Sequence, residues 1–236
     1  MTGEKRKIAG RECTLYASGR PRCLLIQPVD EHDLEGLDRE VSLISAPVEM
    51  PFALCAFRID DWNRDLSPWD APPVFGNVPF GHGAPETLRW MEENLLPELI
   101  ALWEVPENIP VIPGGYSLAG FFALWSATGT GRFSAVACAS PSVWFPGWMA
   151  YAETHPLRTR AVYLSLGDRE EKTRNPVMAR VGDCIRRLHQ MLTGREMPAA
   201  CILEWNEGNH FREPDVRTAK GFSWCMHQIG KERDPL

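Results

Sequence analysis

The chain has 236 residues, of which 44% are apolar, and carries a formal net charge of −6. This length and composition suit one globular domain of the larger α/β kind with a full-sized core. The acidic balance, with basic residues scattered along the chain, argues against nucleic acid or an anionic membrane as a partner.

The N-terminal segment is polar and contains the one basic cluster, Lys5, Arg6 and Lys7, which we expect to lie in a frayed end. No apolar run resembles a signal peptide or reaches the length of a membrane span. The seven cysteines form no C-x-x-C pair, and most lie in apolar segments. We interpret them as reduced thiols that fill the core of a cytoplasmic protein.

Apolar runs of strand length recur along the chain and are continuous, which is typical of strands buried on both faces of a parallel sheet. An additional edge strand is expected over residues 10–20, with a turn at residues 18–21. The runs cover residues 23–29, 52–59, 109–116, 133–139, 161–166 and 201–205.

Helical patterns lie between these runs. Residues 86–103 have apolar side chains at helical spacing, although Pro97 should kink or split that helix. Residues 118–128 are almost wholly apolar and predict a buried helix, whereas residues 177–192 and 215–229 are amphipathic with basic residues on the exposed face. Alternating strands and helices predict a single α/β domain over residues 1–236, with a mostly parallel sheet and helices on both faces.

Two long segments follow predicted strands. Residues 60–85 are rich in Pro, Gly and Trp, and residues 140–156 contain Trp144 and Trp148. Both emerge at the carboxyl ends of strands, where open α/β sheets bind their ligands. Trp62, Trp69, Trp144 and Trp148 either line a binding site for an aromatic or apolar group or form the small cores of these segments.

Ser117 occupies the corner between a predicted strand and a predicted helix, in the sequence GGYSLAGFFALW. A nucleophile elbow needs small residues two positions before and two positions after its serine, because strand and helix nearly touch there. Gly115 and Ala119 stand at those positions, with Gly120 next. This pattern favours a nucleophilic serine over a serine that only caps a helix.

A nucleophilic serine needs a base, and the base needs an orienting acid. His210, in EGNHF, follows the last predicted strand and would be delivered to the same edge of the sheet as Ser117. The strand at residues 161–166 is followed by Asp168, Glu170 and Glu171. Asp168 directly follows the strand-ending glycine, and Glu170 has more chain with which to reach His210. Both carboxylates remain open at this point, with Glu170 preferred.

The oxyanion hole requires two backbone N–H groups near the developing negative charge. The residue after the nucleophile, Leu118, supplies one at the positive end of its helix. We expect the second from Glu31 or His32, in the loop after the strand at residues 23–29.

The segments GGYSLAGFFALW, SLGDREEKTRNP and EGNHF, in that order, resemble the esterase branch of the α/β-hydrolases, which includes siderophore esterases and S-formylglutathione hydrolase. The resemblance extends from about residue 22 to the last helix and implies an α/β-hydrolase fold without a separate lid domain. It implies that Ser117 is the nucleophile, His210 the base and Glu170 the acid of a Gly-x-x-Asp/Glu pattern. DDWNRDLSPW resembles a loop that carries an arginine near the substrate, which points to Arg64.

The expected activity is therefore that of a serine carboxylic-ester hydrolase that forms an acyl-enzyme on a small or medium ester, without a metal or organic cofactor. Arg64, Trp62 and Trp144 are the expected substrate-binding residues. An acyltransferase on the same residues, or a non-catalytic binding protein, are the alternatives. The Trp-rich segments could also form the contact of a homodimer.

Overall fold

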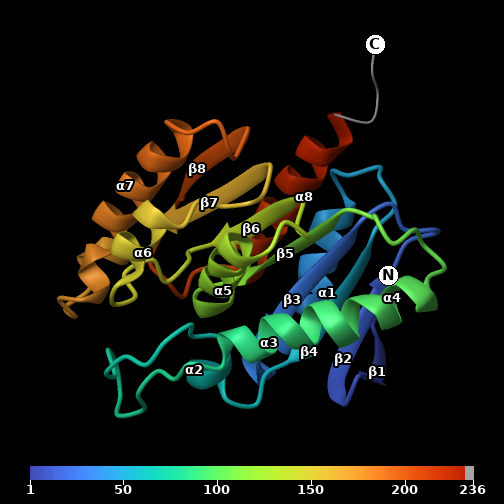
Figure 1. The fold of residues 1–236 in the computed structure, drawn as a ribbon, viewed down its shortest axis with the longest axis horizontal. Helices are drawn as coiled ribbons and strands as arrows, with labels where there is room; N and C mark the ends of the chain where they lie inside the picture. Colours follow the sequence, from blue (N-terminus) through green and yellow to red (C-terminus); the bar gives the residue numbers. More distant parts are fainter. Residues whose placement is uncertain (232–236) are drawn as a thin grey trace.

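The sheet of the molecule has eight strands in the order β1-β2-β4-β3-β5-β6-β7-β8 in the computed structural model, which describes residues 1–231 (Figure 1). β1, β2 and β4 pair antiparallel, and all pairs from β4 to β8 are parallel. The predicted α/β fold with a mostly parallel sheet is confirmed; residues 232–236 of the predicted domain lie outside the described residues. The strands are β1 (Glu4–Ile8), β2 (Arg11–Ala17), β3 (Leu24–Val29), β4 (Ala53–Arg58), β5 (Val111–Tyr116), β6 (Ala135–Ala139), β7 (Ala161–Gly167) and β8 (Ala200–Asn206).

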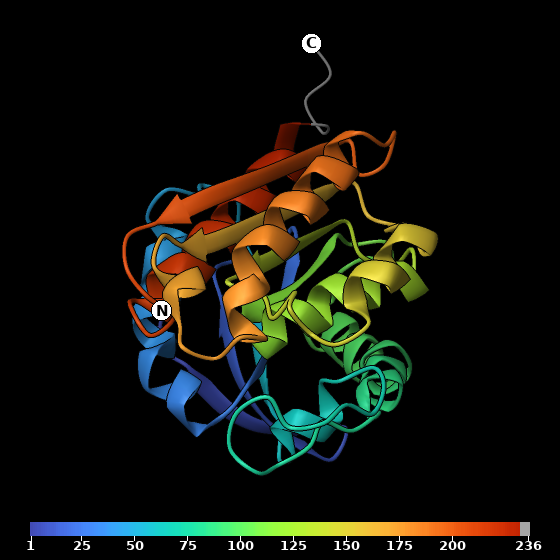
Figure 2. The ribbon, with the colours of Figure 1, turned by 90° about the vertical axis from the view of Figure 1, so that its left-hand side faces the viewer.

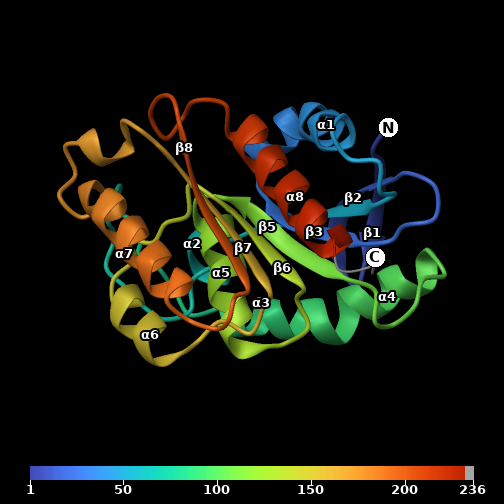
Figure 3. The same cartoon turned by 90° about the horizontal axis from the view of Figure 1, so that it is seen from above.

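Helices cover both faces of the sheet, as predicted. α1 and α8 pack on one face, whereas α3 to α7 lie on the other (Figures 2 and 3). Each face has its own cluster of buried apolar side chains, so the core consists of two layers with the sheet between them. The helices are α1 (Glu31–Ser45), α2 (Trp62–Asp65), α3 (Ala84–Trp90), α4 (Leu96–Leu102), α5 (Leu118–Gly129), α6 (Trp148–Thr154), α7 (Val181–Thr193) and α8 (Pro214–Lys231), with short turns η1 (Met91–Leu95), η2 (Glu170–Lys172) and η3 (Met178–Arg180).

The helix predicted at residues 86–103 changes type before Pro97. η1 is a π-helical turn in which the Leu96 N–H donates to the carbonyl of Met91, five residues back. Proline lacks an N–H and crowds the carbonyl four residues before it, so the wider turn accommodates Pro97 within one continuous helical segment.

The N-terminal basic cluster is not frayed, contrary to the prediction. Lys5, Arg6 and Lys7 lie in β1, which pairs with β2 through a tight hairpin. The two turn residues, Ala9 and Gly10, both have positive φ, at 45° and 86°. Such a hairpin turn usually has Asn or Asp at its first central position, and the alanine there conceals the hairpin in the sequence.

The two long segments at residues 60–85 and 140–156 contain regular secondary structure. The chain between β4 and α3 contains α2 and a bridge between Ala71 and Phe80, and the chain after β6 contains α6.

β8 is half-buried, because it is an edge strand of the sheet, so the expectation that it is buried on both faces was wrong. Six of the seven cysteines are buried, and Cys201 is half-buried. No helix within residues 1–231 is long and apolar enough to cross a membrane.

Candidate active site

The turn between β5 and α5 forces Ser117 into a strained backbone conformation, with φ 56° and ψ −117°. Strand and helix touch at this turn: a Cβ on Gly115 would lie 2.7 Å from the Ala119 Cβ, and a Cβ on Gly120 would lie 2.7 Å from the carbonyl oxygen of Gly115. The small residues are therefore a steric requirement, and the turn has the geometry that the sequence predicts for a nucleophile elbow.

Two further side chains meet the hydroxyl of Ser117 at the carboxyl edge of the sheet. His210 follows β8, and its Nε2 lies 3.0 Å from the Ser117 Oγ. Glu170 follows β7, and its Oε2 lies 2.6 Å from the His210 Nδ1. The Glu170 side chain is only 4% exposed, against 23% for that of His210. The structure therefore brings Ser117, His210 and Glu170 into one hydrogen-bonded chain.

Asp168, the other candidate acid, has a different contact. Its Oδ1 accepts a hydrogen bond of 2.8 Å from the backbone N–H of Gly208, two residues before His210. Glu170 is the first residue of the short η2 turn, and its side chain is buried. The structure thus places Glu170, and not Asp168, against the imidazole.

The second oxygen of Glu170 is held by three donors. Its Oε1 accepts hydrogen bonds from the Ser140 Oγ at 2.7 Å, the Gly167 N–H at 2.7 Å and the Arg217 Nη1 at 2.9 Å. Burial alone would raise the pKa of Glu170, but the bond and charge of His210, together with the donors Ser140 and Gly167, lower the pKa below its ordinary value. Glu170 is therefore a carboxylate at neutral pH.

Arg217 was missed by the sequence analysis, which assigned the basic residues of this amphipathic segment to the exposed face. The side chain lies on α8 and is only 2% exposed. It donates to the Tyr116 hydroxyl at 3.0 Å, and that hydroxyl donates to the carbonyl oxygen of His210 at 2.7 Å. Helical periodicity contains no signal for such a residue, because its partners belong to distant segments.

The residues predicted for the oxyanion hole lie in two helices. Leu118 is the first residue of α5, where an N–H has no acceptor within the helix. Glu31 and His32 lie in the first turn of α1, not in a loop, because Asp30 caps the helix directly after β3. Their side chains are turned elsewhere: Glu31 pairs with Arg58 at 2.8 Å, and that of His32 is 83% exposed. Their role as backbone donors stays a prediction.

Ser142 supplies a second hydroxyl that the sequence analysis did not select. Its Oγ lies 3.3 Å from the Ser117 Oγ, and its backbone N–H donates to the Ser117 carbonyl oxygen at 3.1 Å. The side chain is buried, so this second hydroxyl lies inside the protein beside the Ser117 Oγ.

Arg64 and Trp62 were predicted to bind substrate, and the structure gives both of them partners within the protein. The Arg64 guanidinium pairs with Asp65 at 2.8 Å and Glu86 at 3.1 Å. Trp62 is half-buried and packs against the core. Neither lines the cavity beside His210, so their contact with substrate stays a prediction.

The other tryptophans divide between the two interpretations left open by the sequence. Trp148 is fully buried, and the Trp69 indole donates to the carbonyl oxygen of Pro146 at 2.8 Å, so both build the core of these segments. Trp144 instead lines a cavity that contains His210 and Glu170. Packing therefore explains Trp69 and Trp148, and only Trp144 reaches the candidate site.

This carboxyl-edge cavity has a volume of about 280 Å³. Its walls combine apolar side chains with two cationic side chains. Phe211, next to His210, is 84% exposed. The apolar wall includes Trp144, Met178, Val181 and Phe211, and the cations are Arg169 and Lys172.

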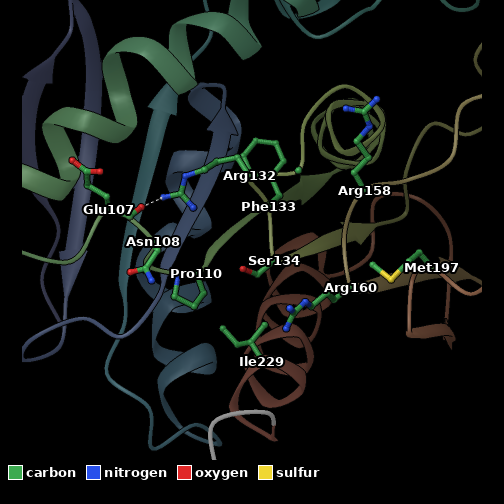
Figure 4. Close-up of a pocket in the computed structure, with 11 residues that line it drawn as sticks. Glu107, Asn108, Pro110, Arg132, Phe133, Ser134, Arg158, Arg160, Met197 and Ile229 are labelled. Atoms are coloured by element: carbon green, nitrogen blue, oxygen red, sulfur yellow. Dashed lines mark hydrogen bonds between the residues drawn. The ribbon is translucent and has the colours of Figure 1, made fainter.

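A larger cavity of about 590 Å³ lies at the opposite, amino edge of the sheet, before β5, β6 and β7 (Figure 4). Arg132 donates there to the carbonyl oxygens of Ile109 and Glu107. The side chains of Arg132, Arg158 and Arg160 point in different directions (Figure 4). No group of three or more His, Cys, Asp or Glu side chains in the described part of the chain could hold a metal ion.

No protein-family model and no curated protein sequence matches the chain. Solved structures do. An IroE-like serine hydrolase from Shewanella oneidensis has a TM-score of 0.78 and 14% identity over 94% of this chain and 79% of its own. The siderophore hydrolase EstA from Aspergillus nidulans has a TM-score of 0.73 and 19% identity over 96% and 94% of the two chains.

The enterobactin esterase FES from Shigella flexneri is also similar, with a TM-score of 0.68 and 13% identity. The match covers 97% of this chain but only 59% of that protein. At such identities the likeness establishes the fold. Together with the strand order and the strained serine turn, it shows that this chain has the α/β-hydrolase fold that the sequence predicts.

Proposed function

We propose that this protein is a serine ester hydrolase with Ser117 as nucleophile, His210 as base and Glu170 as acid. The observation that carries the proposal is the hydrogen-bonded chain Glu170–His210–Ser117, with distances of 2.6 Å and 3.0 Å, built on a strained serine turn. A nucleophile within reach of a base that is itself oriented by a buried carboxylate is the arrangement that activates a serine.

In the proposed reaction, His210 Nε2 removes the Ser117 proton while the Oγ attacks the ester carbonyl. The tetrahedral intermediate collapses to an acyl-enzyme, and His210 gives that proton to the departing alcohol. Water then attacks the acyl group, with His210 again removing a proton and returning it to the Ser117 Oγ. Glu170 remains a carboxylate throughout and stabilises the imidazolium that forms.

The oxyanion is held, in this proposal, by the N–H of Leu118 and by a second backbone N–H from Glu31 or His32. The amino end of α5 adds the positive end of its helix dipole at the same point. Removing one such donor from a comparable site raises the barrier by about 2.7–4 kcal/mol.

The carboxyl-edge cavity supports a small or medium substrate with an aromatic portion, because Trp144 and Phe211 form part of its wall. Two of the similar structures are named as a siderophore hydrolase and an enterobactin esterase. A siderophore ester is therefore the first natural substrate class to test. Arg169 and Lys172 in the wall are compatible with a substrate that carries negative charge.

The test is hydrolysis of a panel of aryl and alkyl esters by the wild type and by Ser117→Ala. The matched control is Ser142→Ala, which removes a neighbouring hydroxyl but not the proposed nucleophile. We expect turnover in the wild type and the control, and none above background in Ser117→Ala. Equal turnover in all three would overturn the proposal, and product analysis with added alcohols detects acyl transfer.

The expectations of a cytoplasmic location and of a homodimer stay predictions. Cell fractionation tests the first. Sedimentation of the purified protein at several concentrations tests the second.

A further inference from the structure

The buried guanidinium of Arg217 joins four segments at the candidate site. A charged side chain that is only 2% exposed requires partners for its N–H groups, because an unpaired buried charge is strongly unfavourable. Arg217 has such partners on both terminal nitrogens. They come from the end of β5, from Ser140 directly after β6, from η2 and from the loop after β8, which are far apart in the sequence.

On the acid side, Arg217 is one of the donors that give the two Glu170 oxygens different hydrogen-bond partners. Oε1 accepts from the Arg217 Nη1, the Ser140 Oγ and the Gly167 N–H, whereas Oε2 accepts from the His210 Nδ1. Rotating the carboxylate away from His210 would break several bonds in a buried site. The donors on Oε1 therefore fix the direction in which Oε2 points.

On the base side, the same guanidinium holds the loop that carries His210. Its Nη2 donates to the carbonyl oxygens of Glu207 and Asn209, each at 3.1 Å. Through Tyr116 it reaches His210 as well, because the Tyr116 hydroxyl accepts from Arg217 and donates to the His210 carbonyl. Arg217 thus binds the backbone just before His210 directly, and it binds the His210 carbonyl through the Tyr116 hydroxyl.

We propose that Arg217 is a positioning residue. It holds the Glu170 carboxylate and the His210 loop in the relative positions at which the hydrogen bond between Glu170 and His210 forms. This inference rests on the proposed function and names a residue that no part of the mechanism uses directly. The planar guanidinium presents its N–H donors from separate nitrogens in a rigid fork, whereas a lysine ammonium presents its donors from one nitrogen at the end of a flexible chain.

The first experiment compares Arg217→Lys and Arg217→Met with the wild type in ester hydrolysis. We expect kcat to fall about 10-fold in Arg217→Lys and about 100-fold in Arg217→Met, by analogy with hydrogen-bond partners that orient metal-binding side chains, with KM changed less than about threefold. Arg39→Met is the matched control, because Arg39 also binds α8, through Asp215 at 2.8 Å, but lies outside this network. If Arg217→Met does not fold, Arg217→Lys, which keeps the charge, carries the test.

The second experiment repeats Arg217→Lys in a Glu170→Gln background. If Arg217 acts through the acid, the two losses in kcat are not independent, and adding Arg217→Lys to Glu170→Gln lowers kcat less than about threefold. The same fold-loss in both backgrounds would contradict a role through Glu170. A folded Arg217→Met protein with wild-type kcat would overturn the inference altogether.

Proton NMR provides a readout that does not need turnover. A short hydrogen bond between the His210 Nδ1–H and a carboxylate gives a low-field proton resonance, which Glu170→Gln should abolish. We expect Arg217→Met to lose or broaden this resonance, and Arg39→Met to retain it. If the wild type hydrolyses no ester, the proposed function fails, and this resonance still tests whether Arg217 holds the pair; its persistence unchanged in Arg217→Met would contradict the inference.

Discussion

The cavities at the two edges of the sheet differ both in volume and in the side chains that line them, and the larger cavity is not the one with the candidate catalytic residues. The amino-edge cavity is the larger, at about 590 Å³, and has three arginines in its wall, but their side chains diverge (Figure 4). The carboxyl-edge cavity has about 280 Å³, yet its wall includes His210 and Glu170, which share a 2.6 Å hydrogen bond. The candidate site is therefore identified by polar side chains that bond to one another, and not by the volume of the cavity.

Backbone strain shows the same contrast. Ser117 and Ser140 have positive φ, at 56° and 42°, and each directly follows a strand at the carboxyl edge. No residue with a side chain in the wall of the amino-edge cavity, within residues 1–231, has positive φ. Strain of this kind is costly and persists where the surrounding structure holds it, as at catalytic turns.

The largest expected effect comes from Ser117→Ala, which removes the proposed nucleophile from the carboxyl edge. We expect kcat to fall on the order of 10⁴-fold or more, as when a nucleophilic serine is removed from a comparable triad. The measurement is steady-state hydrolysis of an activated aryl ester, with circular dichroism as the control for folding. A loss smaller than tenfold would show that another group attacks the ester.

The two neighbouring carboxylates provide the next test. Glu170→Gln should lower kcat about 10⁴-fold, because an amide cannot stabilise the imidazolium and favours the wrong tautomer. Asp168→Asn should lower it less than about tenfold, because the Asp168 carboxylate accepts a hydrogen bond from the Gly208 N–H, whereas the imidazole bonds Glu170. The reverse order of the two effects would assign the acid to Asp168.

A smaller effect distinguishes the two cavities directly. Phe211→Ala removes an exposed ring beside His210, and we expect KM for an aryl ester to rise by about 3- to 10-fold as apolar contact is lost. Arg158→Ala, in the wall of the amino-edge cavity, should leave kcat/KM within about twofold of the wild type. A larger effect of Arg158→Ala than of Phe211→Ala would assign substrate binding to the amino edge.

The smallest effect is on stability. Because the folded-state pKa of Glu170 is lowered, this residue stabilises the fold above its unfolded pKa of about 4.3, and that contribution is lost as the pH falls through the folded value. The fall in Tm between pH 7 and acid pH should therefore be about 2–4 °C larger in the wild type than in Glu170→Gln. Equal falls, measured by differential scanning calorimetry, would show that the carboxylate is not stabilised in the folded protein.

Local patterns were sufficient to predict the framework of the site. The parallel strands have continuous apolar runs. Gly115 and Ala119, two positions before and after Ser117, must be small because strand and helix touch there, and this requirement can be seen within five consecutive residues. His210 could be selected from the sequence because it lies in the loop after β8, a strand whose carboxyl end faces the same edge as Ser117.

Features that depend on distant segments were not predictable in the same way. The choice between Glu170 and Asp168 depends on the η2 turn, whose direction no local pattern specifies. Arg217 looks like an exposed helix residue until Tyr116 and Glu170 are placed around it. The β1–β2 hairpin was missed because Ala9 replaces the residue type that normally signals its turn.

The most direct test of the central claim is labelling with a fluorophosphonate probe, followed by peptide mapping, on the wild type, Ser117→Ala and His210→Ala. An activated serine reacts with this probe, whereas an ordinary serine does not. We predict modification at Ser117 in the wild type, none in Ser117→Ala and labelling at least about 100-fold slower in His210→Ala. A folded wild-type protein that is not labelled, or that is labelled at another residue, would contradict the account.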